Sequence, residues 1–176
     1  MEKKFESLIN YFFDRKINTI SREAGDILRL IAMSKFIDNT LVIGGDIGLA
    51  PLCIKSAIPN AWLDMVGYFT DKRSAFIKRI FDNCGLRFIS TFNGNVKTFM
   101  HELKQYDLVY IHLEDDRDYY GEYLKELFIG NHLIKDCFIV IYTEKNLNAE
   151  TTSFLADKCN QIMKIDNANL LIAKIK

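Results

Sequence analysis

A glycine-rich segment follows a short apolar run in the first third of the chain. It reads NTLVIGGDIGLAPL, from Asn39 to Leu52, and a helix-like pattern comes after it. In α/β proteins a strand that ends in a glycine turn and leads into a helix is a common place for a nucleotide-like cofactor. Tight strand–helix turns also need glycine when no ligand binds, so this interpretation stays open beside the first. Asp46 stands where such turns usually have another glycine.

His112 and the acidic run 114–118 are the other residues whose types suggest chemistry. An imidazole at a strand end can serve as a general base, because histidine titrates near neutral pH. A hydrogen-bonded structural histidine fits the same position. The run LEDDRD can bind a metal or a cationic substrate, or it can be a solvated loop. Tyr120 can face a flat substrate or pack in the core.

Composition limits the class of protein. The chain has 176 residues, and its 23 basic residues equal its 23 acidic residues, which is not typical of a general nucleic-acid binder. The four cysteines form no CxxC pair, and we expect buried reduced thiols. The three histidines lack the spacing of a zinc site. With no signal-like start and no run of about 20 apolar residues, we predict a cytoplasmic protein without a membrane segment.

Apolar periodicity predicts helices alternating with strands. Helices are expected at residues 5–15, 51–57, 71–83, 96–103, 119–128 and 151–160. One more helix is expected after 5–15, starting near Ser21, which would be its N-cap. Strands are expected at 40–43, 62–69, 87–91, 108–113, 138–142, 162–165 and 170–175, with the last two joined by the polar turn DNAN.

This alternation predicts an α/β fold: a Rossmann-like, mostly parallel seven-stranded sheet with a C-terminal antiparallel hairpin and helices on both faces. We expect one domain over 1–176, with N-terminal helices in 1–37 and the Rossmann-like core in 38–176. Ligands of such sheets bind at the carboxyl ends of the strands. That rule brings 44–48, 68–70, 94–95 and 112–116 to one rim.

The ordered series of local motifs resembles class I S-adenosylmethionine-dependent methyltransferases. In particular it is similar to the small O-methyltransferases that include catechol and caffeoyl-CoA enzymes. ISREAGDILRLIA resembles vSPEqGqLLrlLa, LVIGGDIGLA resembles LEIGTGTGYS, and DKRSAFIKRIFDNCGL resembles DPERAEIARENFARAGL. NGNVKTFMHEL, YDLVYIHLEDD, YYGEYLKEL and LLIAKIK are similar to GDALEVLPEL, FDLVFIDADK, NYPEYLEL and LLIARKR. The resemblance covers nearly the whole chain in order and implies the methyltransferase fold.

The resemblance also implies a cofactor site for S-adenosylmethionine, with S-adenosylhomocysteine as the product. The implied cofactor-binding residues are Ile20, Gly44, Gly45, Asp46, Gly48, Tyr68, Phe69, Gly94, Asn95 and His112. Gly44 and Gly48 match the family motif. Val42 and Asp46 replace its glutamate and middle glycine, and Tyr68 replaces the acidic residue that binds the ribose.

The family's metal site is the part that departs most. Its metal-binding aspartate aligns with His112, and its Asp-Asn pair aligns with Tyr142–Thr143. Magnesium prefers carboxylate oxygens, so we predict no metal site. The family's catalytic lysine aligns with Asp115, or with Arg117 if a gap is moved; His112 and Asp115 are therefore the predicted catalytic residues.

Three functions remain open from the sequence. The first is methyl transfer to a small molecule or nucleoside, with His112 as base and no metal. The second is a catalytically degenerate methyltransferase-like module that binds a partner or forms a homodimer. The third is binding of a different nucleotide-like ligand at the same rim. The retained Gly44, Gly48 and Gly94 favour the enzyme, whereas the changed positions favour the module.

Overall fold

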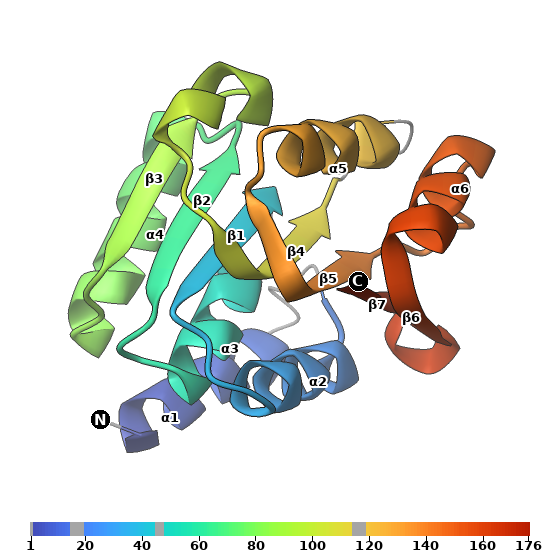
Figure 1. The fold of residues 1–176 in the computed structure, drawn as a ribbon. Helices are drawn as coiled ribbons and strands as arrows, with labels where there is room; N and C mark the ends of the chain where they lie inside the picture. Colours follow the sequence, from blue (N-terminus) through green and yellow to red (C-terminus); the bar gives the residue numbers. More distant parts are fainter. Residues whose placement is uncertain (1, 15–19, 45–47, 114–118) are drawn as a thin grey trace.

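The computed structural model describes residues 2–14, 20–44, 48–113 and 119–176 (Figure 1). Its seven strands form one sheet in the order β3-β2-β1-β4-β5-β7-β6. The strands are β1 (Asn39–Gly44), β2 (Trp62–Gly67), β3 (Ile89–Asn93), β4 (Tyr106–His112), β5 (Leu133–Tyr142), β6 (Cys159–Ile165) and β7 (Leu170–Ile175). The first five pair in parallel, and β7 runs antiparallel to both β5 and β6. The predicted sheet is therefore confirmed.

Helices cover both faces of the sheet. One face carries α1 (Glu2–Asp14), α2 (Arg22–Met33), α3 (Leu49–Ala57) and α4 (Asp71–Cys84). The other carries the 3₁₀ helix η1 (Val96–Glu102), α5 (Tyr120–Ile129) and α6 (Ala149–Lys158). Side chains of a strand alternate between the two faces, so Val42 joins the first core while Leu41 and Ile43 join the second. Among the described residues, no helix is long and apolar enough to cross a membrane.

Local sequence signals set several helix ends. The hydroxyl of Ser21 accepts a hydrogen bond from the Ala24 amide at 3.1 Å, which confirms Ser21 as the N-cap of α2. Thr70 caps α4 in the same way through the Arg73 amide at 3.3 Å. Gly85 ends α4 with a φ of 67°, in the left-handed region that glycine adopts without steric cost.

All four cysteines are free and buried, as predicted. Burial raises the pKa of the Cys53 thiol to about 12 and that of Cys159 to about 11. Such thiols stay protonated at neutral pH and are poor nucleophiles.

Several predicted boundaries are wrong. β2 ends at Gly67 instead of Phe69, and residues 96–102 form a 3₁₀ helix instead of an α-helix. β5 begins at Leu133, five residues before the predicted start. The polar stretch at its beginning includes Asp136, with a φ of 64°, and hides the strand pattern. Helix α6 ends at Lys158, and β6 follows at once from Cys159.

Candidate cofactor-binding site

The carboxyl ends of the five parallel strands form a continuous rim. Gly94 follows β3, Gly67 ends β2 and Gly44 ends β1, while His112 and Tyr142 end β4 and β5. Gly44 pairs with His112 in the sheet register. The predicted stretches around Gly44, Tyr68, Gly94 and His112 thus lie along one edge, which is where a doubly wound sheet binds ligands.

Three of the rim glycines have a packing reason to be glycine. Gly44 has a φ of 78°, and a Cβ there would lie 1.9 Å from the backbone oxygen of His112. A Cβ on Gly67 would lie 3.1 Å from the ring of Phe69, and one on Gly94, whose φ is 147°, would lie 3.2 Å from the ring of Phe99. Side chains at these positions would disturb the strand ends with or without a ligand.

Gly48 is the N-cap residue of α3 and has a φ of 87°. No side chain among the described residues caps this helix, and the helix dipole favours negative charge at its first N–H groups. A Cβ on Gly48 would make only ordinary contact, 3.5 Å from Ile77. Of the predicted loop residues between Gly44 and Gly48, both Gly45 and Asp46 lie outside the described residues.

The segment after β2 is held by a residue that the sequence analysis missed. The side chain of Asn93 accepts a hydrogen bond from the Phe69 amide at 2.9 Å and donates one to the Phe69 carbonyl at 3.1 Å. Phe69 is 8% exposed, whereas its neighbour Tyr68 is 72% exposed. The only sequence signal for this clamp is an asparagine directly before Gly94, and asparagine is common at turns for other reasons.

Two further predicted cofactor residues have structural tasks. The side-chain oxygen of Asn95 accepts a hydrogen bond from the Lys97 amide at 2.9 Å and caps η1. Ile20 lies directly before the cap of α2 and is buried in the core of the first face. The Asn95 side chain also carries an NH₂ group, which is a hydrogen-bond donor, whereas the Ile20 side chain is apolar.

His112 and Tyr142 meet at the ends of β4 and β5. Their ring centroids are 4.7 Å apart and the ring planes are inclined by 66°, an edge-to-face contact. Burial raises the pKa of the Tyr142 phenol. The phenol is therefore protonated at neutral pH and is a poor general base.

Tyr120 is a structural residue, and the idea that it faces a flat substrate is wrong. It is 1% exposed, and its hydroxyl accepts a hydrogen bond from the Leu113 amide at 3.2 Å. The same hydroxyl donates a hydrogen bond to the Tyr142 carbonyl at 3.1 Å. Tyr120 thereby ties together the strand ends that carry His112 and Tyr142.

The described residues contain no group of three or more histidine, cysteine, aspartate or glutamate side chains that could hold a metal ion. The acidic run 114–118, which includes the predicted catalytic residue Asp115, lies outside them. The described part of the rim therefore brings together backbone groups at the strand ends, the His112 side chain and the Asn95 side chain.

Solved structures share this architecture over nearly the whole chain. A methyltransferase from Geobacter sulfurreducens aligns with a TM-score of 0.75 and 16% identity, covering 98% of this chain and 90% of that one. A Podospora anserina methyltransferase bound to S-adenosylhomocysteine aligns with a TM-score of 0.74 and 14% identity, covering 99% of this chain and 86% of that one. A protein from Staphylococcus aureus, provisionally described as a caffeoyl-CoA O-methyltransferase, aligns with a TM-score of 0.73 and 14% identity. The alignment covers 98% of this chain and 91% of that one.

The chain has the class I methyltransferase fold. Its sequence matches no protein-family model and no curated protein. At these identities the likeness to solved structures concerns the fold alone.

Proposed function

We propose that the chain binds S-adenosylmethionine at the rim and transfers its methyl group to a small-molecule or nucleoside acceptor, without a metal ion and in the cytoplasm. The observation that carries the proposal is the start of α3 at the rim, where Gly48 has a φ of 87° and no side chain among the described residues caps the first backbone N–H groups. Similar folds include proteins crystallised with S-adenosylmethionine or S-adenosylhomocysteine.

The residues at the turn fit such a cofactor. The start of α3 suits the carboxylate of the methionine part, since no side chain among the described residues caps its first backbone N–H groups. The Asn95 amide can donate to the adenine. The fit is poorest for the ribose, because the described residues place no carboxylate at the end of β2, where Tyr68 lies, to accept hydrogen bonds from its hydroxyls. We therefore expect weak binding.

When bound, S-adenosylmethionine supplies an electrophilic methyl group. His112 would accept the proton that the acceptor oxygen or nitrogen loses as the new bond to the methyl forms, while S-adenosylhomocysteine leaves. The chain's main task is to hold the acceptor in line with that methyl, and positioning is a large part of such catalysis. Because His112, Tyr142 and Thr143 are poor magnesium ligands, we expect EDTA to leave the activity unchanged.

A second function has an observation of its own. Packing accounts for Gly44, Gly67 and Gly94 without any ligand, as the 1.9 Å approach to the His112 oxygen shows for Gly44. A chain that had lost catalysis would still keep these glycines. The alternative is therefore a catalytically degenerate methyltransferase-like module that binds a partner or forms a homodimer, for which light scattering would give twice the 20.4 kDa mass of one chain.

Titration calorimetry with S-adenosylhomocysteine separates the two functions. The decisive variants are Tyr68→Asp, which adds the missing carboxylate, and Tyr68→Asn, a control of similar size without the charge. Tyr68 is 72% exposed, so neither substitution should disturb the fold. A charge-assisted hydrogen bond is worth about 1.5–3 kcal/mol, so Tyr68→Asp should bind about tenfold tighter or better, and Tyr68→Asn should not. No heat with millimolar ligand for any of the three proteins would favour the degenerate module.

A further inference from the structure

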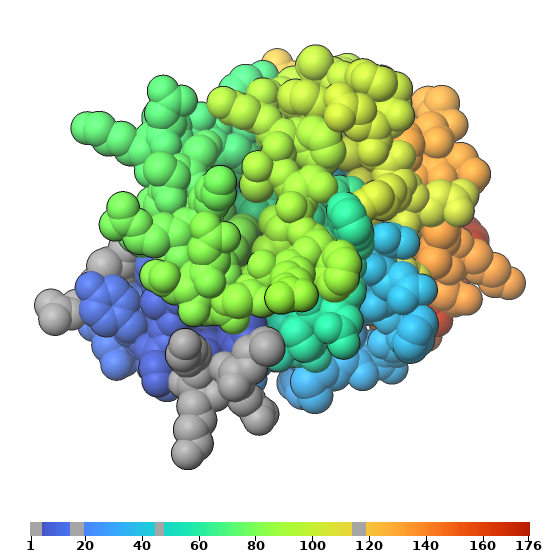
Figure 2. Space-filling model, turned by 90° about the vertical axis from the view of Figure 1, so that its left-hand side faces the viewer, coloured from blue at the N-terminus to red at the C-terminus, as the bar shows by residue number. Residues whose placement is uncertain are grey.

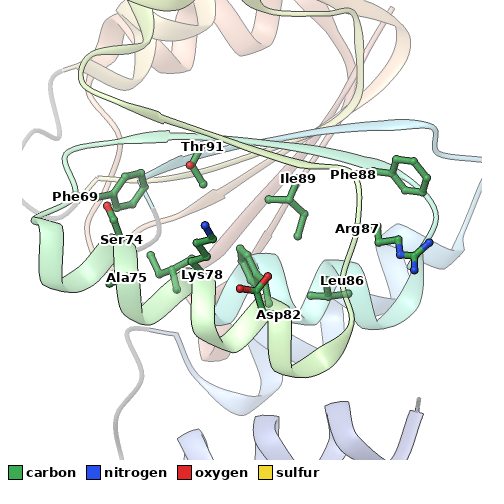
Figure 3. A pocket seen from close by; sticks show the side chains of 12 residues that line it. Phe69, Ser74, Ala75, Lys78, Asp82, Leu86, Arg87, Phe88, Ile89 and Thr91 are labelled. Carbon is green, nitrogen blue, oxygen red and sulfur yellow. The ribbon is translucent and has the colours of Figure 1, made fainter.

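A cavity of about 540 Å³ lies between α4 and the edge strand β3, beside the rim. Figure 2 looks onto this side of the molecule, and Figure 3 shows the lining from close by. Its apolar part comes from the side chains of Phe69, Ile77, Phe81, Leu86, Phe88 and Ile89. The size is that of a small-molecule site.

The sequence of α4 explains why the space is not filled. The helix packs Ile77, Phe81 and Cys84 into the core, but the adjacent stripe, at steps of four residues, is Ser74, Lys78 and Asp82. This stripe overhangs β3, where the side chain on the same face after Ile89 is Thr91. Polar side chains therefore stand where large apolar ones would have closed the gap.

The charges of the lining are unequal and unpaired. Lys78 and Arg87 are cationic and Asp82 is anionic, which leaves a net charge of +1. Neither cation makes an ion pair within the part of the chain that the structure describes. Lys78 rises from the middle of α4 toward the strands, while Arg87 lies at one end beside Phe88 (Figure 3). An ammonium group over an apolar floor suits a ligand with an anionic head and an apolar body.

We propose that this cavity is a second binding site, separate from the rim, for a small amphipathic organic anion such as an aliphatic or aromatic carboxylate. Its head pairs with Lys78, and its body lies on the ring of Phe81 and the side chains of Ile77 and Ile89. This site does not depend on methyltransferase activity. The two sites share only Phe69 among the residues that the structure describes.

The probe is the fluorescent anion 8-anilinonaphthalene-1-sulfonate, displaced by octanoate or by the neutral 1-octanol. We expect octanoate to displace it at about fivefold lower concentration than 1-octanol, since a partly exposed charge pair contributes about that factor. Lys78→Gln should remove this difference and Lys78→Arg should keep it. Asp82→Asn should tighten octanoate binding about twofold. Lys72→Gln, on an exposed residue of the same helix that does not line the cavity, is the matched control.

Three results would overturn the proposal. They are absence of probe binding at millimolar concentration, equal effects of Lys78→Gln and Lys72→Gln, and displacement of octanoate by S-adenosylhomocysteine. The last would make the cavity part of the rim site. If S-adenosylhomocysteine does not bind at all, the proposed function fails while octanoate binding still tests the cavity, so the two failures are distinguishable.

Discussion

At the scale of single residues, two buried tyrosines of β4 differ in what their hydroxyls touch. Tyr106 and Tyr110 are both 0% exposed. The Tyr106 hydroxyl donates to a carboxylate oxygen of Asp64 at 2.8 Å and accepts from the Lys104 amide at 3.2 Å. The Tyr110 hydroxyl has no hydrogen-bond partner among the described residues. A buried hydroxyl without a partner loses its hydrogen bonds to water on folding and forms none in the folded protein, which lowers stability.

The same substitution should therefore have opposite effects at the two sites. Tyr110→Phe should raise the free energy of unfolding by about 1 kcal/mol and the melting temperature by about 2–4 °C. Tyr106→Phe should lower the free energy of unfolding by about 1–2 kcal/mol, because it leaves the buried Asp64 with one donor fewer. Urea denaturation of both variants measures this. A loss of stability in Tyr110→Phe would mean that its hydroxyl is satisfied in solution.

At the scale of elements, helix α2 shows how a local signal and a long-range contact combine. Ser21 caps its first turn, and Arg29 in its middle pairs with Glu6 of α1. Ala24, Leu28 and Ala32 form its buried stripe. The cap sets where the helix begins, while the stripe and the ion pair set which way it faces.

Ser21→Ala should lower the free energy of unfolding by about 1 kcal/mol, because the Ala24 amide loses its acceptor. Ser21→Asp keeps an acceptor and places a negative charge at the helix start, so it should retain the wild-type value. Thermal unfolding of the two variants checks the prediction. Equal losses in both would show that the serine contributes something other than a cap.

Elements with a strong local signal could be predicted from the sequence, and others could not. Apolar runs such as LVI predicted the strands and the class of sheet. The start of β5 was missed because Asp136 interrupts the pattern and its pairing depends on β4, which is distant in sequence. The clamp of Asn93 on Phe69 was missed for the same reason, since the two residues are 24 positions apart. Side-chain contacts between strands that are distant in sequence produce no pattern in the local sequence.

At the scale of the whole molecule, one buried charge should shape the pH dependence of stability. Lys55 is 0% exposed, and its ammonium donates to the carbonyls of Pro59, at 2.7 Å, and of Ala61. Burial lowers the pKa of Lys55 from 10.5 to about 8. Between these values the unfolded chain holds a proton that the folded chain has released. Stability therefore rises with pH across this window.

The comparison with Lys55→Met isolates this contribution. From pH 7.5 to pH 10, the free energy of unfolding of the wild type should gain about 2 kcal/mol relative to Lys55→Met. Other groups that titrate in this range, including the tyrosines, cancel in the difference. Urea denaturation at several pH values measures it, and a difference that stays constant with pH would contradict the lowered pKa.

The close approach of Gly44 to the His112 carbonyl also determines what a glycine at this position can say about the evolution of proteins with this fold. A Cβ at residue 44 meets backbone and not a flexible side chain, so selection for folding alone would retain the glycine after any loss of catalysis. A glycine at this position is then equally expected in active enzymes and in their inactive descendants. Position 68 is more informative, because its side chain is mostly exposed and packing therefore constrains it little. A carboxylate at this position would indicate that the protein binds a ribose.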